Sequence, residues 1–257
     1  MHLFFIRHGQ SANNDLWERT GANRGRSEDP ALTKMGQQQA GLLADFVGSI
    51  DCAVRQNGQD AAGEPSGKGP LGSVVVNGLR RDYFGFTHLY TSLMIRSVAT
   101  GTPLSEAVGL PLTAWTDIHE TGGIFLEDEE TGEPYGLPGR SRSYFSENYQ
   151  KLVLPDTLGE EGWWNRPMES DLQRTERAQQ VLAELLARHS RSSDRVAMVS
   201  HGAFYNHLMR AIFGGNTHNS WWLMNNTGIT RVDFGEEGRA MLIYHNRTEH
   251  LPEELIT

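Results

Sequence analysis

Residues 2–9 read HLFFIRHG, and residues 195–202 repeat the pattern near the other end of the chain as RVAMVSHG. In each stretch an apolar run leads directly into a histidine and a glycine. The run at 2–6 is too short for a helix and is bounded by polar residues, which predicts a buried strand, and 195–200 is predicted to be another. Two such units can bring two imidazoles together at one edge of a sheet, where open α/β folds place their sites.

The rest of the chain alternates predicted strands and helices. Ser170 and Gln173 form a capping box that opens a strong helix. Such alternation favours a largely parallel sheet covered on both faces by helices, which is an α/β fold. Residues 12–31 are polar and are predicted to be a loop. The predicted helices cover residues 32–47, 95–108, 170–189 and 203–213, and the further predicted strands cover 88–92, 229–234 and 240–245.

The length of 257 residues suits a single α/β domain, and no linker or internal repeat divides the chain. We therefore expect one domain over residues 1–257 with two additions. Residues at about 55–83 are a predicted surface insertion, because its first part is rich in Gly, Gln, Ser and Pro. Residues 121–168 show little periodicity and contain many Gly, Pro and aromatic residues, which is typical of a lid or a binding loop.

Composition limits the classes of partner. The net charge is −9 without any basic run, so the chain is a poor nucleic-acid binder. No apolar stretch approaches the roughly 20 residues of a membrane span, and the N-terminal run lacks the pattern of a signal peptide. The single cysteine, Cys52, excludes an intrachain disulfide and a cysteine-built zinc site. We expect a soluble cytoplasmic protein with no membrane partner, and a homodimer is left open.

Three candidate functional residues lie at the carboxyl end of a predicted strand: His8, Ser92 and His201. Neutral imidazole can attack phosphorus through one nitrogen if the other donates its proton to a backbone carbonyl. Arg96 lies one helical turn after Ser92, and it would form an oxyanion clamp with Arg7 if a phosphate lay between them. Neighbouring cations would lower the pKa of His8 and keep it neutral, whereas His201 could stay charged and bind a phosphate oxygen.

Each of these signals has a plainer interpretation when it is taken alone. His8 could be a strand-end histidine held by a core hydrogen bond, and Ser92 with Arg96 could be a helix cap beside a solvated cation. Gly9 would let the backbone approach an anion closely. Glu120 could protonate the leaving oxygen of an ester and then activate water, but it is also one acid among 32. The combination favours a site for phosphoryl transfer.

Taken in order, these elements resemble one family, the histidine phosphatase superfamily in its phosphoglycerate-mutase-like branch. The likeness runs from residue 3 to about residue 234, and Gln10 departs from it because many members carry Glu there. The matching residues are Arg7-His8-Gly9 with Ser11 and Asn14; Asp29, Leu32, Thr33 and Gly36 with Gln39 and Ala40; Tyr90-Thr91-Ser92 with Arg96; Glu120; Glu169-Ser170 with Arg177; and Ser200-His201-Gly202.

The resemblance implies a three-layer α/β sandwich with a mostly parallel central sheet. It implies that His8 accepts the phosphoryl group as a phosphohistidine and that Glu120 acts as the acid and then as the base. No metal or other cofactor is expected, and the partner would be a small phosphorylated substrate. The catalytic set is His8, Glu120, Arg7, Arg96 and His201, and the phosphoryl oxygens would be bound by Arg7, Asn14, Arg96, His201 and Gly202.

The leading hypothesis is therefore a metal-independent phosphomonoester hydrolase, a histidine acid-type phosphatase. The runner-up is a phosphoglycerate-type phosphomutase, which returns the phosphoryl group to the substrate, and Gln10 argues against it. A non-catalytic phospho-ligand binding module is a third alternative, but such a module has no need for the acid Glu120. A metallohydrolase is disfavoured because neither His-x-Glu nor His-Glu-x-x-His occurs.

The excursion at 121–168 holds a further candidate site. A second anionic group could be bound by Arg140, Arg142 and Arg166, with the ring of Trp163 or its neighbour lining one side of the site. The alternative is a loop pinned by buried aromatic residues and carrying solvated arginines. No spacing rule separates the two interpretations.

Overall fold

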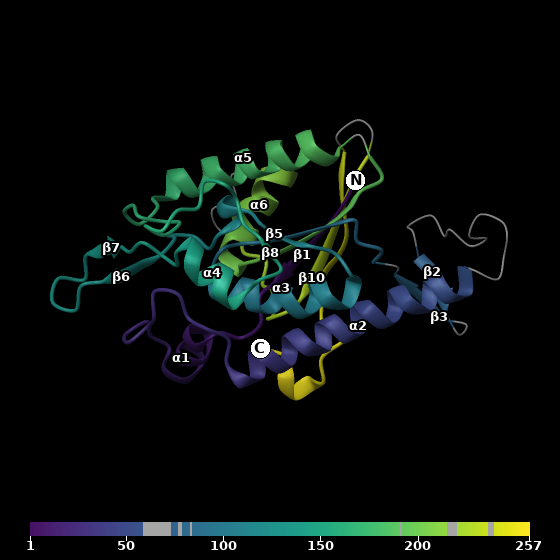
Figure 1. Ribbon diagram of the computed structural model, residues 1–257, viewed down its shortest axis with the longest axis horizontal. Coiled ribbons are helices and arrows are strands. Elements are labelled where there is room, and N and C mark those ends of the chain that lie inside the picture. Colours follow the sequence, from purple (N-terminus) through teal and green to yellow (C-terminus); the bar gives the residue numbers. More distant parts are fainter. Residues whose placement is uncertain (59–72, 77–78, 83, 191, 215–219, 236–238) are drawn as a thin grey trace.

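The computed structural model describes residues 1–257 apart from 59–72, 77–78, 83, 191, 215–219 and 236–238. A seven-stranded sheet forms its centre (Figure 1). The two strands at one edge run antiparallel to their neighbours, and the other five are parallel to one another. Across the sheet the strands are β11 (Ala240–Arg247), β10 (Ile229–Phe234), β1 (His2–Arg7), β9 (Arg195–Ser200), β4 (His88–Thr91), β5 (Leu112–Ala114) and β8 (Leu152–Val153).

The register of the sheet brings the two histidine motifs together. β1 and β9 pair in parallel, with Arg7 opposite Ser200, so the two apolar runs end at the same level. The backbone N–H of His8 continues the ladder and donates to the Ser200 carbonyl over 2.9 Å. β4 pairs with the other side of β9. His8, Ser92 and His201 therefore share the carboxyl edge of the parallel strands, as the sequence predicts.

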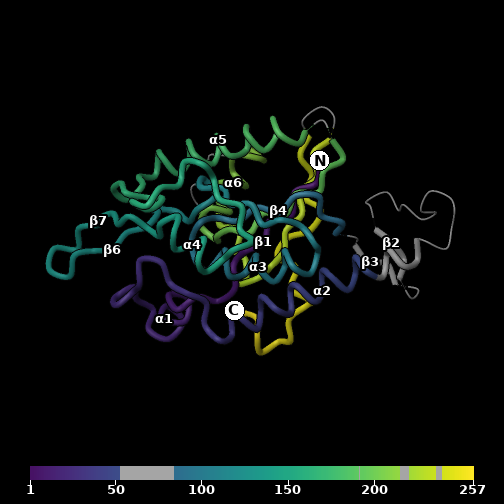
Figure 2. The backbone as a smooth tube through the Cα atoms, in the orientation of Figure 1, coloured from purple at the N-terminus to yellow at the C-terminus, as the bar shows by residue number. Residues whose placement is uncertain are grey.

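Helices cover both faces of the sheet, so the molecule has three layers. One pair packs against one face and a second pair against the other (Figures 1 and 2). This confirms the predicted fold class, an α/β fold with a mostly parallel sheet flanked by helices. The first pair is α2 (Lys34–Gly58) and α3 (Ile95–Val108), and the second pair is α5 (Asp171–His189) and α6 (Gly202–Phe213).

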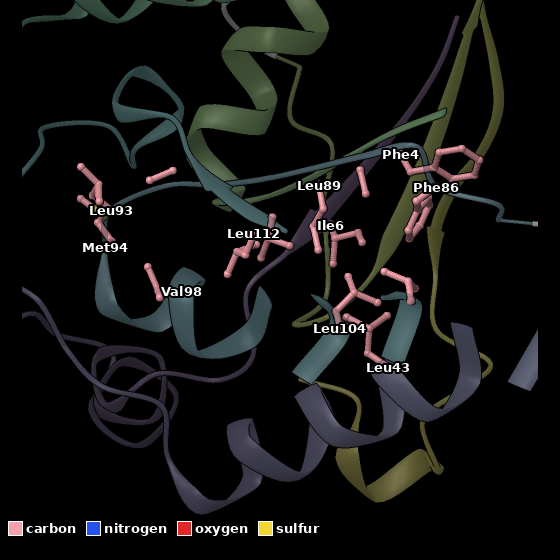
Figure 3. Packing of buried hydrophobic residues seen from close by; sticks show 14 of the residues in the cluster. Phe4, Ile6, Leu43, Phe86, Leu89, Leu93, Met94, Val98, Leu104 and Leu112 are labelled. Atoms are coloured by element: carbon pink, nitrogen blue, oxygen red, sulfur yellow. The ribbon is translucent and has the colours of Figure 1, made fainter. Parts of the chain in front are cut away.

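Alternate side chains of β1 supply two hydrophobic clusters, one under each helix layer. Phe4 and Ile6 point to the α2–α3 side, where Leu43 of α2 joins the same cluster (Figure 3). Leu3 and Phe5 point to the other side and pack in the cluster beneath α5 and α6. A strand that is buried on both faces loses the polar–apolar alternation of an exposed sheet, which is why β1 appears in the sequence as an unbroken apolar run.

Helix α1 (Ala12–Thr20) lies in the segment 12–31, which the sequence predicts to be a loop, so that prediction is wrong for these residues. Ser11 and Asn14 form a capping box: each side chain accepts the backbone N–H of the other residue. The helix ends at Gly21, whose φ of 64° suits a glycine cap. None of its residues is buried, so no apolar periodicity distinguishes it from a polar loop.

Helix α2 extends beyond its predicted range of 32–47 into the predicted insertion at 55–83. Like every other helix among the described residues, it lacks the apolar length needed to cross a membrane. Within the insertion, β2 (Ser73–Val76) and β3 (Leu79–Asp82) pair antiparallel. The remainder of the insertion, residues 59–72, 77–78 and 83, lies outside the described residues.

The excursion at 121–168 contains more regular structure than predicted. Its elements are two to seven residues long, which is too short for a hydrophobic period to show. Strand β8 even joins the main sheet beside β5. The single-domain assignment stays a prediction. The other elements of the excursion are the hairpin of β6 (Phe125–Glu127) and β7 (Pro134–Gly136) and helix α4 (Arg142–Asn148).

Candidate active site

A cavity of about 620 Å³ opens at the carboxyl edge of β1, β9 and β4. Segments far apart in the chain line it, and most of the predicted site residues are among them. His201 lies directly beside it, because its ring centroid is 5.0 Å from that of His8. The predicted residues that line the cavity are Arg7, His8, Asn14, Arg96, Glu120 and Gly202.

The ring of His8 is held in one tautomer. Its Nδ1 lies 2.7 Å from the Gly9 carbonyl oxygen, and the Nε–H of Arg96 donates to its Nε2 over 3.1 Å. Since a guanidinium can only donate, Nε2 must be the acceptor, and the proton therefore sits on Nδ1. Burial lowers the pKa of His8 well below its usual value, and the charges of Arg96 and Arg7 lower it further. The imidazole is neutral, with its free electron pair on Nε2.

Arg7 and Arg96 concentrate positive charge around His8. Arg7 donates through Nη1 to the Met224 carbonyl, and its buried Nε has no partner among the described residues. Arg96 lies 3.7 Å from Asp29, which is nearly inaccessible to solvent. Burial lowers the pKa of both guanidinium groups and raises the pKa of Asp29 to about 6. A bound anion would relieve this desolvated excess of cations.

The surroundings of His201 disfavour the charged form that the sequence leads us to expect. His201 is fully buried, and burial lowers its pKa well below the usual value, with Arg96 adding to the effect. Its Nε2 lies 2.7 Å from the Ser92 hydroxyl and 3.2 Å from that of Ser97. Its buried Nδ1 has no partner in the described part of the chain. Ser92 therefore orients His201, and Nδ1 is the ring atom left for a ligand.

Glu120 is fixed at the start of helix α6. Its Oε1 accepts the backbone N–H groups of Thr121 (2.8 Å) and Phe204 (2.9 Å), and its Oε2 accepts that of Ala203 (3.3 Å). Helix N-termini favour negative charge and leave such N–H groups without a helical partner. The carboxyl group is thereby held at the rim of the cavity that contains His8.

A buried ion pair supports the segment that carries Glu120. Arg177 grips Glu169 with two hydrogen bonds of 2.6 and 2.8 Å, and its Nη1 also donates to the carbonyls of Asp117 and His119. Both side chains are buried. A bidentate pair of this kind fixes direction as well as distance, so it holds the chain on either side of Glu120 in place.

Asn14 and two glycines complete the predicted set. Asn14 uses its Oδ1 to accept from Ser11, which leaves its amide nitrogen as the atom that can donate to a ligand. Gly202 lines the cavity beside Arg7. Gly9 has a packing role as well: a Cβ there would lie 2.5 Å from the Gly36 carbonyl oxygen. A residue with a side chain would therefore not fit between the His8 loop and α2.

The structure does not bring the candidates of the 121–168 excursion to this cavity. Arg142 donates to the carbonyls of Leu158 and Pro155, which fastens α4 to the following loop. Trp163 is buried in a hydrophobic cluster. Arg140 and Arg166 are exposed and lie over the rings of Tyr144 and Trp164. This matches the alternative in which buried aromatic residues pin the loop.

Other residues line the cavity that the sequence analysis does not single out. Arg26 lies in the loop after α1, with its guanidinium 4.2 Å above the ring of Phe125. Trp17 and Trp221 are exposed aromatic side chains at the rim, and Arg174 of α5 adds a further cation. They come from polar loops and helix ends without a motif, and only the folded chain brings them together.

Comparison with known proteins points to a phosphatase family, in agreement with the geometry of the site. The family model of the histidine phosphatase superfamily (branch 1) matches residues 76–247. That range contains Arg96, Glu120 and His201 but begins after His8. The structure places His8 beside Arg96 and His201. Among curated proteins no match is found.

Several solved structures share the fold. Phosphoserine phosphatase from Entamoeba histolytica, in complex with 3-phosphoglyceric acid, is 20% identical with a TM-score of 0.56, covering 98% of this chain and 99% of that chain. The mycobacterial glucosyl-3-phosphoglycerate phosphatase complexed with VO3 is 17% identical with a TM-score of 0.54, covering 95% and 98%. A putative α-ribazole-5′-P phosphatase from Escherichia coli is 17% identical with a TM-score of 0.55, covering 96% and 97%.

Proposed function

The chain belongs to the histidine phosphatase superfamily, branch 1, and from that premise we propose that it hydrolyses small phosphomonoesters through a phosphohistidine formed on His8. One observation carries the proposal. The Nδ1 of His8 is committed to the Gly9 carbonyl, and its Nε2 accepts from Arg96 in the cavity that Arg7 also lines. This is the arrangement in which a neutral imidazole attacks phosphorus.

In the first step the phosphoryl group enters between Arg7 and Arg96, which takes the Arg96 N–H away from His8. The freed electron pair on Nε2 attacks phosphorus, and the bond from phosphorus to the ester oxygen breaks on the opposite side. The Glu120 carboxyl group gives a proton to the leaving oxygen, so the alcohol departs neutral. Asn14 and His201 bind the equatorial oxygens, where the transition state carries its charge.

In the second step water replaces the alcohol. The Glu120 carboxylate takes a proton from the water as its oxygen bonds to phosphorus, and the bond between phosphorus and Nε2 of His8 breaks. Phosphate leaves, and both side chains return to their starting protonation states. Because every proton and charge is handled by side chains, the proposed cycle needs no metal.

Water is favoured over the substrate alcohol as the second acceptor. A mutase must keep water out of its cavity while the alcohol turns around, whereas this cavity has an open rim, where Trp17 and Trp221 are 54% and 59% exposed. Proteins with this fold carry the names of phosphatases for phosphoserine and for glucosyl-3-phosphoglycerate, which supports a hydrolase for this chain as well.

The test is release of phosphate from p-nitrophenyl phosphate in excess EDTA. We expect wild type to release phosphate and His8→Ala to release none. His207→Ala is the matched control, because this histidine lies on α6 but outside the cavity that holds His8. Equal release by wild type and His8→Ala contradicts the proposal, as does loss of wild-type activity in EDTA.

A further inference from the structure

Three ligating side chains meet at the edge of the sheet opposite the cavity. His88 opens strand β4, His189 ends helix α5, and Asp194 directly precedes strand β9. One potential ligand atom from each lies within 4.8 Å of the other two. No other group of three histidine, cysteine or acidic side chains converges in this way among the described residues.

We propose that these three side chains bind one divalent transition-metal ion, with Zn²⁺ as the representative ion. Two imidazoles and a carboxylate are ligands that zinc accepts, and water would complete the coordination. The single cysteine excludes only zinc sites built from several cysteines. This site contains no thiolate, so that exclusion does not apply to it.

The distances suit an ion after small movements. The Nδ1 of His189 lies 2.8 Å from Asp194 Oδ2, and the Nδ1 of His88 lies 3.9 Å from the same oxygen. Bonds of roughly 2.0–2.2 Å in a tetrahedral site separate neighbouring ligand atoms by about 3.3 Å. The distance from His189 to Asp194 must therefore lengthen and that from His88 to Asp194 shorten, each by about half an ångström, and the two imidazole nitrogens, which lie within 4.8 Å of each other, must come to a similar spacing. The His88 side chain is 42% exposed and can make this adjustment after leaving the Thr87 hydroxyl.

Outside the three ligands, Tyr90 orients His189. The Nε2 of this buried histidine lies 3.2 Å from the Tyr90 hydroxyl. When Nε2 carries the proton and donates to that oxygen, Nδ1 has a free electron pair for the metal. The neutral ring therefore changes tautomer as the ion binds, with its proton moving from Nδ1 to Nε2. Such a second partner is typical of metal-bound histidines.

Position separates this site from the proposed chemistry. Strand β9 begins next to Asp194 and ends at Ser200, a span of about 20 Å for a strand. Through its three ligands the ion would cross-link the start of β4, the start of β9 and the end of α5. We therefore expect bound zinc to raise thermal stability, because an ion that binds only the folded chain stabilises it by mass action. The inference stands whether or not the chain is a phosphatase.

The test is zinc titration of tag-free, EDTA-stripped and dialysed protein, followed by calorimetry and by thermal unfolding. Wild type should bind one zinc ion per chain with a rise in melting temperature. His88→Ala should weaken binding by at least about tenfold and abolish the rise, and Tyr90→Phe should weaken it about tenfold. His88 is partly exposed, so its removal leaves the fold intact.

Two controls exclude binding elsewhere. His2 pairs with Asp233 at the same 2.8 Å but has no second imidazole beside it in the described part of the chain, so His2→Ala should bind zinc as wild type does. The titration in His8→Ala removes the catalytic imidazole as a ligand. Equal zinc affinity in wild type and His88→Ala, or no binding by wild type, overturns the proposal and leaves a structural His–Asp hydrogen bond.

Discussion

At the scale of single residues, the account depends on the protonation of His8. Burial, and then the charges of Arg96 and Arg7, lower its pKa well below the ordinary value. Only the neutral ring can attack phosphorus, and a lowered pKa means that the ring stays neutral as the pH falls. The ordinary pKa of histidine is about 6.5. The kcat/KM for p-nitrophenyl phosphate should therefore stay level as the pH falls through that value and decline only at lower pH. An acidic limb centred at or above that value contradicts the assignment.

Glu120 has two proposed roles that one substitution separates. Glu120→Gln keeps an oxygen that can accept the N–H of Phe204 but cannot give or take the proton. Nitrophenolate leaves without a proton, so the first turnover should remain as a burst equal to the enzyme concentration. Steady turnover should fall by about 10² to 10⁴, because water then lacks its base. Stopped-flow absorbance measures both, and an unchanged steady rate argues against Glu120.

At the scale of elements, the contact between the His8 loop and helix α2 positions the site. A Cβ at Gly36 would lie 2.1 Å from the Gln10 carbonyl oxygen, which is backbone and cannot turn away. Gly36→Ala should therefore lower the free energy of unfolding by about 1–3 kcal/mol and also reduce kcat. Urea unfolding and steady-state kinetics measure the two effects.

Gly41 provides the matched control on the same helix. A Cβ there has nothing within 4 Å, so Gly41→Ala should raise the free energy of unfolding by about 0.5–1 kcal/mol, as alanine does in a helix. It should leave kcat unchanged. If both variants behave alike, the close contact at Gly36 does not position the His8 loop.

Elements with buried faces could be predicted, and those without could not. The helix at 95–108 and the strand at 229–234 lie where the sequence predicts them, because burial imposes a pattern on their residues. Helix α1 buries none of its residues and leaves no such pattern. The short elements of the 121–168 excursion depend on tertiary contacts, such as the pairing of β8 with β5, that no local pattern encodes.

At the scale of the whole molecule, the cavity is a cationic site built from distant parts of the chain. Burial lowers the pKa of Arg7 and of Arg96, which shows that their charge is desolvated without full compensation. Inorganic phosphate should therefore stabilise the fold, by about 2.7 kcal/mol at a concentration one hundred times its Kd. Urea unfolding measures this gain against sodium chloride of equal ionic strength.

Arg96→Lys tests whether the gain arises in this cavity. Lysine keeps the charge but loses the fork that binds two phosphate oxygens at once. The stabilisation by phosphate should shrink to a small fraction at the same phosphate concentration. Equal stabilisation of wild type and variant would place the phosphate elsewhere on the molecule.

The motif residues of the site could be predicted because short strands carry them to a known edge. His8, Arg96 and Glu120 line one cavity, and His201 lies against it, as the order of motifs suggests. The downward shift of the His201 pKa could not be predicted, because it follows from burial that only the fold determines. The side chains at the rim, such as Arg26, Trp17 and Trp221, lie on loops and exposed helices whose paths depend on the whole molecule.

The most direct test of the central claim is to trap the covalent intermediate. Glu120→Gln is mixed with p-nitrophenyl phosphate, quenched in alkali, digested and analysed by mass spectrometry. We predict one phosphoryl group on the peptide that contains His8, lost on treatment with acid, and absent from the same variant carrying His8→Ala. Wild-type phosphatase activity with no phosphorylated peptide in the trapped variant, or with the phosphoryl group on another residue, would contradict the account.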